Sequence, residues 1–278
     1  MTTPHLKPFN RILVTGAAGY LGGVLRPELR GLTKILRLSD LMPPSQAPGA
    51  GEEFVRADLS DPAQVAAAMD GVDAVVHLGG VSVEAAWEPI LQANIIGTYN
   101  MFEAARQAGV RRFVYASSHH AIGYYRRERQ VGPDEPVRPD SRYGVSKVFG
   151  EAVGRLYADK YGMSVVAQRI GVARPKPQNP RGLIAWLSER DYVQLTRRCL
   201  EAPDIHFLVV YGVSANDGSL WRNPGADAIG FQPQDNGAEY AQEVLAATPA
   251  QAEPESERPF HGGWFCGMEF SGDPRRID

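Results

Sequence analysis

A tyrosine and a lysine four residues apart could together take a proton from an alcohol. The stretch RYGVSKVFGE places Tyr143 and Lys147 at positions i and i+4, in a chain with only five lysines. On a helix, both side chains would project from the same face. A free phenol has a pKa of about 10, and a neighbouring ammonium favours the phenolate and lowers that value. The pair therefore predicts a phenol that acts as a general base on a hydroxyl group.

An ordinary helical pair is the alternative, because eleven tyrosines and five lysines give roughly 0.2 such spacings by chance. The position of the pair in the chain decides between the two readings. It lies downstream of a glycine-rich turn, and the apolar run before it ends in Ser117 and Ser118. A serine hydroxyl at that point could hold the substrate oxygen beside the phenol.

The elements that must position these side chains alternate between apolar runs and helical patterns. Most runs are rich in Val and Ile and nearly continuously apolar, as expected of strands buried on both faces. Helices are predicted over 89–108, beginning with Pro89, and over 141–161, ending near Gly162. The strands are predicted at 11–16, 34–40, 53–59, 73–80, 112–118 and 164–171. This order predicts an α/β fold with a Rossmann-like, doubly wound parallel sheet, whose ligands lie at the carboxyl ends of the strands.

We expect a single domain over residues 1–278, in three parts. Residues 11–173 form the Rossmann core, with a ligand site predicted at the carboxyl ends of its strands. Residues 174–247 form a small substrate-covering lobe, with a helix at 188–201 and a strand at 206–212 after a proline-rich loop. Residues 248–278 form an extended C-terminal tail, whose aromatic end needs a surface to pack on, such as that of a neighbouring subunit.

Composition excludes several classes of partner. The net charge of −3, with 44% hydrophobic and 22% charged residues, is ordinary for a soluble globular protein and marks no nucleic-acid surface. The N-terminal MTTPHLKPFN lacks the apolar core of a signal peptide, and no apolar run is long enough for a membrane span. Two cysteines and six histidines show no metal-ligand spacing. We expect a cytoplasmic protein without a structural metal, and without a nucleic-acid or membrane partner.

A glycine-rich turn, GAAGYLG, follows the first predicted strand and opens a helix. Glycines there let the backbone approach a pyrophosphate, which the helix N-terminus stabilises. A tight strand–helix turn without a ligand is the alternative. The turn supplies the candidate cofactor contacts Gly16, Gly19, Tyr20, Leu21 and Gly22.

Acidic and glycine residues follow the next three predicted strands. Asp40 ends the second strand, where a carboxylate can bind the adenosine ribose and repel a 2′-phosphate, so NAD is favoured over NADP. The alternative for Asp40 is a helix cap. An adenine could lie at Asp58 and Leu59, and Leu78, Gly79 and Gly80 would allow another close backbone approach. Asn94 interrupts an apolar helix stripe, and its amide would bond either cofactor-lining backbone or a purely structural partner.

In this order the motifs resemble the short-chain dehydrogenase/reductase superfamily, in its extended branch. GAAGYLG, the Asp at the second strand, NIIGT, ASS and YGVSK all match, over roughly residues 11 to 173. The resemblance implies that Ser118, Tyr143 and Lys147 are the catalytic set. Ala173 follows the sixth strand and should border the nicotinamide.

A closer resemblance, over about residues 11 to 245, is to the bacterial uronate dehydrogenases. The matching stretches are VHLGGVSVE, ASSHHAIGYY, YGVSKVFGE and GVSANDGSLW. It implies that NAD oxidises galacturonate or glucuronate at C1 to an aldarolactone, and that the subunits associate into a homo-oligomer. Arg181 would clamp the substrate carboxylate with two parallel bonds, although a solvated loop arginine is the alternative. The candidate substrate-binding residues are Ser82, Ser118, His119, His120, Val172 and Arg181.

His119 stands where relatives carry Asn, and Val172 where they can have Ser, so a side-chain hydrogen bond from Val172 is impossible. Either histidine could instead be a satisfied structural residue. Two rival functions use the same fold. A nucleotide-sugar epimerase or dehydratase shares the Tyr-Lys pair, but needs a larger lobe. A non-catalytic NAD-binding regulator would have lost the Ser-Tyr-Lys set, which is intact here.

Overall fold

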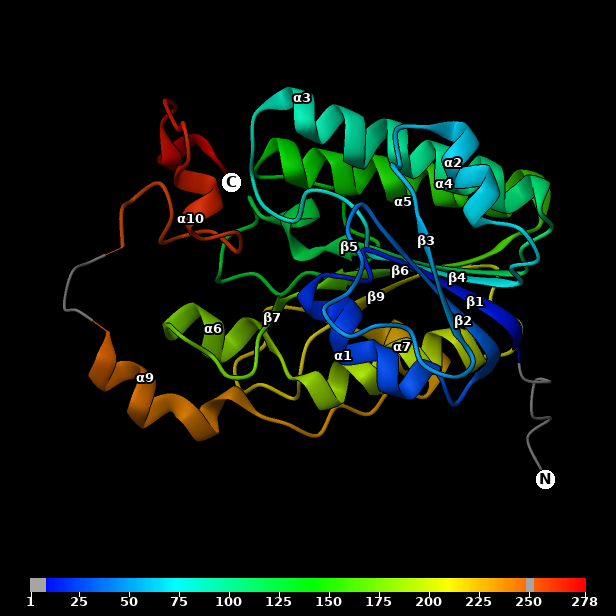
Figure 1. The fold of residues 1–278 in the computed structure, drawn as a ribbon. Helices are drawn as coiled ribbons and strands as arrows, with labels where there is room; N and C mark the ends of the chain where they lie inside the picture. Colours follow the sequence, from blue (N-terminus) through cyan, green and yellow to red (C-terminus); the bar gives the residue numbers. More distant parts are fainter. Residues whose placement is uncertain (1–8, 249–252) are drawn as a thin grey trace.

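The computed structural model describes residues 9–248 and 253–278. Seven parallel strands form one sheet in the order β3-β2-β1-β4-β5-β6-β9 (Figure 1). The predicted Rossmann-like, doubly wound α/β fold is confirmed. Residues 1–8, which hold most of the N-terminal stretch considered for a targeting signal, and residues 249–252 of the tail lie outside the described residues. The strands are β1 (Phe9–Thr15), β2 (Thr33–Asp40), β3 (Glu52–Arg56), β4 (Ala74–His77), β5 (Arg112–Ser118), β6 (Ser164–Ile170) and β9 (Phe207–Gly212).

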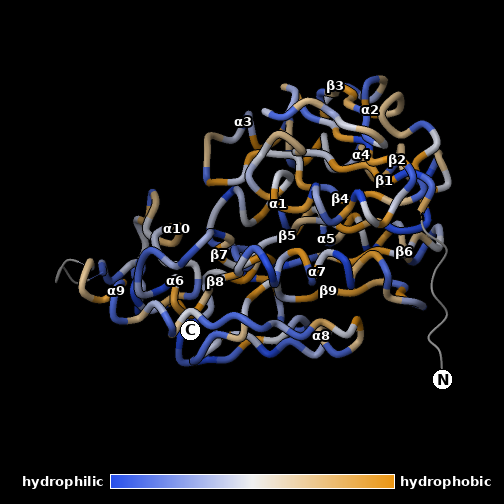
Figure 2. Tube along the Cα trace, turned by 60° about the horizontal axis from the view of Figure 1, so that its bottom comes forward, coloured by the Kyte–Doolittle hydropathy of each residue, from blue (hydrophilic) through white to orange (hydrophobic). Residues whose placement is uncertain are grey.

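Helices cover both faces of the sheet. One face packs against α1 (Tyr20–Leu29), α7 (Glu189–Glu201) and α8 (Pro224–Ile229), and the other against α2 (Pro62–Ala68), α4 (Gly97–Gln107) and α5 (Arg142–Tyr161). Neighbouring strand residues alternate between the two layers: Ile12 and Val14 lie in one core cluster and Leu13 in the other. The hydrophobic segments accordingly gather along the strands, with polar ones at the periphery (Figure 2).

The helix that carries the tyrosine and the lysine has clear signals at both ends. Ser141 is the N-cap of α5, and its side chain accepts a hydrogen bond from the Gly144 amide. Gly162 ends the helix in the left-handed conformation, with φ of 70°. The predicted range 141–161 therefore differs from α5 only by counting the cap as helix.

The helix predicted over 89–108 is longer and less regular than expected. It begins as α3 (Trp87–Ile90), continues through a π-helical segment, η1 (Leu91–Ile96), and runs into α4. The π turn contains Asn94, and such turns are frequent at functional sites. The third and fourth strands also end earlier than predicted, at Arg56 and His77, so the glycines after β4 lie in a loop.

The strand predicted for the lobe belongs to the main sheet instead. β9 pairs in parallel with β6, because its buried residue Val210 lies in the same core cluster as Val166 of β6. The proline-rich loop also differs, since it ends in a short helix, α6 (Pro180–Ala185), capped by Asn179. A small two-stranded sheet joins β7 (Val172–Ala173) to β8 (Trp186–Leu187).

The C-terminal tail is not extended over its described part, residues 253–278. It forms α10 (Trp264–Gly267) and the short 3-10 turn η4 (Pro274–Arg276), and it packs on its own chain. Phe260, Phe265 and Cys266 are buried there without any second subunit. The remaining short helices are η2 (His119–Ile122), η3 (Gly237–Tyr240) and α9 (Ala241–Ala247). In the described part of the chain, no helix combines the length and apolarity needed to cross a membrane.

Candidate active site

The structure brings Ser118, Tyr143 and Lys147 together at the carboxyl edge of the sheet. All three are buried: Ser118 ends β5, and the other two lie in the first turns of α5. The Ser118 hydroxyl lies near the phenol of Tyr143, on the side where it favours the ionised form. The Lys147 Nζ lies 5.4 Å from the centroid of the Tyr143 ring and donates to the Ala116 carbonyl over 2.8 Å. The predicted proximity of the phenol, the hydroxyl and the ammonium is therefore present.

The electrostatics of this group differ from the sequence-based expectation. Burial raises the pKa of Tyr143 to about 12, with the Ser118 hydroxyl acting in the opposite direction and Asp140 adding to the rise. Burial also lowers the pKa of Lys147 to about 8. In the chain without its cofactor, the neighbouring ammonium does not outweigh burial. Each group is buried, and burial disfavours both charged forms.

Glycine turns meet on the cofactor side of the site. Gly16 has a φ of +67°, and a Cβ there would lie 2.8 Å from the Leu78 carbonyl carbon and the Gly79 nitrogen. Only a glycine fits this contact between the loop after β1 and the loop after β4. Gly19 is the N-cap of α1 and provides no side-chain cap, while Gly22 packs against Ala17. The helix amides at this end therefore suit a pyrophosphate.

Asp40 lies beside the same turn. Its carboxylate accepts hydrogen bonds from the Ala18 amide over 3.0 Å and the Leu41 amide over 2.7 Å. It is not a helix cap, since no helix follows β2 before the next strand. The carboxylate is partly exposed at the strand end, where the sequence predicted a ribose contact.

The other predicted cofactor contacts lie in the loop after β3, in η1 and at the start of α1. The Asp58 carboxylate accepts hydrogen bonds from Ser60 in its own turn, and these bonds lower its pKa. A Cβ on Gly79 would collide with the Leu59 side chain, which lies against this glycine. The side-chain amide of Asn94 bonds both backbone groups of Val81 and the Ser146 hydroxyl. Asn94 thus braces the loop after β4 against α5, next to Gly80. Tyr20 donates to Glu189 across the mouth of the turn, and Leu21 packs on the core.

The substrate side is built around two histidines with different partners. The His119 Nδ1 lies 2.9 Å from the Ile170 carbonyl, and its Nε2 lies 2.5 Å from the Arg181 Nη2. A carbonyl only accepts, so Nδ1 carries the proton and Nε2 accepts from the guanidinium. Both ring nitrogens of His119 are therefore bonded within the chain, and the predicted direct contact with a substrate gives way to a contact with Arg181.

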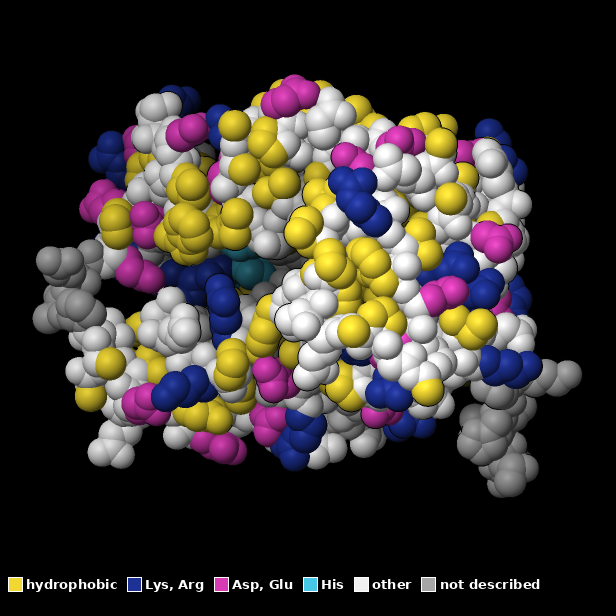
Figure 3. Space-filling view, viewed as in Figure 1, with side chains coloured by type: hydrophobic (Ala, Val, Ile, Leu, Met, Phe, Trp, Pro, Cys, Tyr) yellow, Lys and Arg dark blue, Asp and Glu magenta, His cyan; other side chains and the backbone are white. Residues whose placement is uncertain are grey.

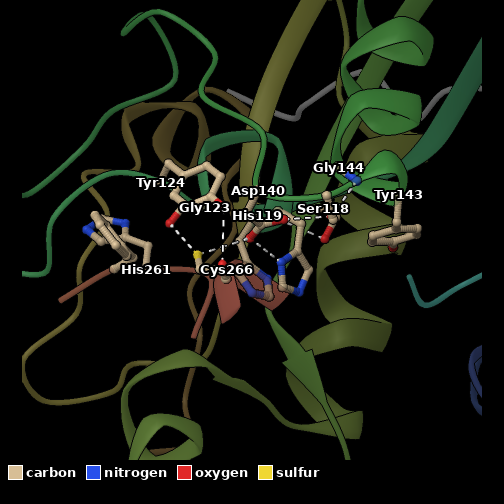
Figure 4. Close-up of polar contacts among 12 residues, drawn as sticks. Ser118, His119, Gly123, Tyr124, Asp140, Tyr143, Gly144, His261 and Cys266 are labelled. Atoms are coloured by element: carbon tan, nitrogen blue, oxygen red, sulfur yellow. Dashed lines mark hydrogen bonds and ion pairs between the residues drawn. The ribbon is translucent and has the colours of Figure 1, made fainter. Parts of the chain in front are cut away.

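His120 is paired with an acid that the sequence did not single out. Its Nδ1 lies 2.7 Å from an oxygen of Asp140. Burial lowers the pKa of both histidines well below the usual value, so they are neutral. Burial also raises the pKa of Asp140 to about 6. Figure 4 shows His119 and Asp140 between Ser118 and Cys266 of the C-terminal segment.

Arg181 projects from α6 toward this group, not from a loop. Its Nε donates to the His261 carbonyl over 2.9 Å, and burial lowers the pKa of the guanidinium to about 10. It is therefore not a solvated surface arginine. Its Nη1 has no hydrogen-bond partner among the described residues and is available to an anion. In Figure 3, histidine lies at the bottom of a hollow, with basic side chains beside it and hydrophobic ones along the rim.

Phe265, in the C-terminal segment, is the clearest contact that sequence reasoning missed. Its ring stacks on His120 at 3.8 Å and lies 6.0 Å from the Tyr143 ring. The aromatic end of the tail was the available signal, but its inward direction depends on contacts over more than a hundred residues. Ser82 is exposed after β4, and Val172 and Ala173 are partly buried in β7.

The Rossmann-like sheet, its glycine turn and the Tyr-Lys-Ser group define a site for alcohol–carbonyl chemistry with a dinucleotide. The chain belongs to the NAD dependent epimerase/dehydratase family, which matches residues 12–193.

Individual relatives narrow this class, and the predicted resemblance to uronate dehydrogenases is confirmed. The chain is 46% identical to the uronate dehydrogenase of Pseudomonas putida, over 96% of this chain and 98% of the relative. It is 47% identical to that of Agrobacterium fabrum, over 92% and 96% of the two chains. A crystal structure of a mutant uronate dehydrogenase from Agrobacterium tumefaciens, complexed with NAD, has a TM-score of 0.89 at 46% identity, and covers 93% of this chain and 97% of its own.

Proposed function

We propose that the chain oxidises hexuronates, such as galacturonate and glucuronate, at C1 to aldarolactones with NAD. The observation that carries this proposal is one convergence of side chains. The Tyr143 and Ser118 hydroxyls, suited to hold an alcohol, lie beside the His120 ring, and the partly buried cation of Arg181 contacts the neighbouring His119. A hexuronate carries both an oxidisable hydroxyl and a carboxylate, and relatives at 44 to 47% identity bear the name uronate dehydrogenase.

The residues present fit NAD. The backbone contact at Gly16 and the uncapped start of α1 suit the pyrophosphate, and Asp40 suits an adenosine ribose without a 2′-phosphate. Leu59, Gly79 and Gly80 continue this edge after β3 and β4, and Ala173 follows β6 in β7. When bound, NAD supplies the hydride acceptor.

Each side chain has a defined task in the reaction. The C1 hydroxyl lies between Ser118 and Tyr143, and the Tyr143 oxygen takes its proton as the C1–H bond breaks. Lys147, whose Nζ lies 5.4 Å from the centroid of the Tyr143 ring, would favour the phenolate and donate to the nicotinamide ribose. Arg181 binds the carboxylate through its free Nη1, and His119 fixes the orientation of the guanidinium. Substrate orientation supplies much of the rate, because a small polyol must present one C–H bond to the acceptor.

The direct test is formation of NADH from a panel of hexuronates, with neutral aldohexoses as controls. We expect kcat/KM to be at least about a hundredfold higher for the best uronate, because the buried guanidinium has no partner in a neutral sugar. Equal activity on both classes would contradict the proposal.

The rival function, a nucleotide-sugar epimerase or dehydratase, has its own test. A nucleoside diphosphate sugar should raise the melting temperature if the chain binds it. We expect no shift with UDP-galactose in the presence of NAD, and a shift with galacturonate. The reverse pattern would favour the rival.

The coarser assignment of partners is a small-molecule substrate. We further propose that the catalytic pocket is completed within one chain, because Phe265 and the His261 carbonyl come from the same chain as Tyr143. Association into a homo-oligomer remains a prediction, and size-exclusion chromatography with light scattering measures it.

A further inference from the structure

The carboxylate of Asp140 lies between three separate segments of the chain. One oxygen, Oδ2, is 2.7 Å from the His120 Nδ1, and the other accepts from the Ser141 hydroxyl, also over 2.7 Å. The residue is 6% exposed. It is neither a helix cap for α5, which is Ser141, nor part of the Ser-Tyr-Lys group. Its place in the chain therefore calls for another explanation.

Glycines make the room for this carboxylate. A Cβ at Gly123 would lie 1.8 Å from Oδ2, and a Cβ at Gly262 would lie 1.9 Å from it. A Cβ at Gly144 would lie 3.2 Å from Oδ1. These glycines belong to the turn after η2, to the C-terminal segment and to α5. A carboxylate enclosed on three sides by side-chain-free backbone is held in one position.

Hydrogen bonds next to Asp140 hold the C-terminal segment in place. The Gly262 amide donates to the Gly123 carbonyl over 2.8 Å, and the Tyr124 hydroxyl donates to the Cys266 carbonyl (Figure 4). Phe265 follows three residues after Gly262 and stacks on the His120 ring. Asp140 thus touches the segment that supplies Phe265 and the histidine on which Phe265 rests.

The hydrogen bond to Asp140 also sets the tautomer of His120. A carboxylate accepts only, so Nδ1 carries the proton and Nε2 presents a lone pair. No hydrogen bond joins Nε2 to another of the described residues. The ring lies edge-on to Tyr143, with centroids 5.9 Å apart, so the free acceptor belongs to the pocket beside the phenol.

We propose that Asp140 is a positioning residue for the sugar substrate, which keeps His120 as a hydrogen-bond acceptor for a sugar hydroxyl and anchors the C-terminal segment against the pocket. This inference rests on the proposed uronate oxidation for its substrate. Asp140 itself does not contact the reacting atoms in this proposal.

Asp140→Asn tests the proposal, because asparagine keeps the shape of the side chain and removes its charge. An amide can donate to Nδ1 and reverse the tautomer, so the KM for the uronate should rise about ten- to a hundredfold, the size expected for a charge-assisted hydrogen bond. The kcat should change much less, and the affinity for NAD should stay the same. Asp191→Asn is the matched control, since Asp191 is also buried but binds the Gln234 and Asp235 amides away from the pocket.

A double-mutant cycle separates positioning from mere folding. If Asp140 acts through His120, Asp140→Asn should cost little once His120→Gln is present. Full additivity of the two changes in kcat/KM would overturn the assignment of Asp140 to His120. A KM that is unchanged in Asp140→Asn would overturn it as well.

Hydrogen exchange of the NAD-loaded protein tests the anchor without any substrate. Amides of residues 260–266 should exchange at least tenfold faster in Asp140→Asn than in wild type, and at the wild-type rate in Asp191→Asn. Unchanged exchange would remove the anchoring role. If wild type oxidises no uronate yet exchange rises, the proposed function fails while the anchor stands.

Discussion

The two sides of the active site are built in different ways. The cofactor side uses missing side chains: glycines at the ends of β1 and β4 let two backbone turns touch, and the contributing residues lie within the first hundred. The substrate side uses the buried side chains of His119, His120 and Asp140 and the partly buried Arg181, and it is completed by a segment near residue 260. Helix α5 carries Tyr143 and Lys147 between the two.

This difference determines how substitutions on each side should act. Substitutions of the glycines on the cofactor side should act sterically, because the added side-chain atoms collide with backbone. Damage to the substrate side is electrostatic, because removing one partner leaves another buried polar group unpaired. Variants on the two sides should therefore separate cofactor affinity from substrate affinity, while a change of the base on α5 should affect turnover alone.

The largest effect is expected where the two sides meet. Tyr143→Phe removes the proton acceptor, so kcat should fall by about a thousandfold or more. NAD affinity, measured by quenching of protein fluorescence, should remain within a few-fold of wild type, since the ring is retained. A variant that keeps a tenth of the wild-type rate would break the assignment of the base.

Arg181→Ala should produce the next largest effect, confined to the substrate side. Loss of the cation should raise the KM for uronates about thirtyfold or more and leave the KM for NAD nearly unchanged. Arg190→Ala is a control, since that exposed arginine pairs with Asp235 outside the site. Similar losses for uronates and for any slowly oxidised neutral hexose would show that Arg181 does not bind the carboxylate.

Gly16→Ala addresses the cofactor side, with a smaller effect. The left-handed conformation and the 2.8 Å approach to the Leu78 and Gly79 backbone predict a rise of about tenfold or more in the Kd for NAD. Gly23→Ala is a matched control on α1, because a Cβ there meets nothing within 4 Å. If both variants bind NAD as wild type does, the two turns do not shape the cofactor site.

The smallest effect is expected in the free energy of unfolding, from Lys147→Met. Folding lowers the pKa of Lys147 to about 8, below its unfolded value, so the unfolded chain binds more protons between those values. Stability of the wild type therefore rises with pH through that range, and the buried charge costs stability below about pH 8. Without NAD, the variant should be more stable by about 1 kcal/mol at pH 7, after loss of the bond to the Ala116 carbonyl.

Urea unfolding of both proteins at pH 7 and at about pH 9 measures this effect. The advantage of the variant should shrink at the higher pH. An advantage that grows with pH would show that the ammonium is not destabilised by burial.

The elements with local signals were predictable from the sequence. Ser141 and Gly162 mark the ends of α5, and the apolar runs mark the strands, because capping and alternation depend on neighbouring residues. The glycine turn, the end of β2 at Asp40 and the placement of Tyr143 beside Lys147 followed from the same local patterns. These features hold most of the cofactor side.

The substrate side could be predicted only in part. Arg181 and the two histidines were named, but the roles of Asp140 and Phe265 depend on contacts across 20 and 145 positions of the chain. The pairing of β9 with β6 and the inward packing of the tail are also non-local. Without the cofactor, the pKa of Tyr143 is raised and not lowered, because a sequence shows the neighbouring lysine but not the depth of burial.

The ionisation of Tyr143 with and without NAD tests the account most directly. In the chain alone, burial keeps the phenol protonated, so the positive charge of the oxidised cofactor must promote its ionisation. Tyrosinate absorbance of wild type, with Tyr143→Phe subtracted, isolates this one group. With NAD bound, the account predicts that one tyrosinate appears between about pH 7 and 9. A difference spectrum that stays flat through that range would contradict Tyr143 as the base.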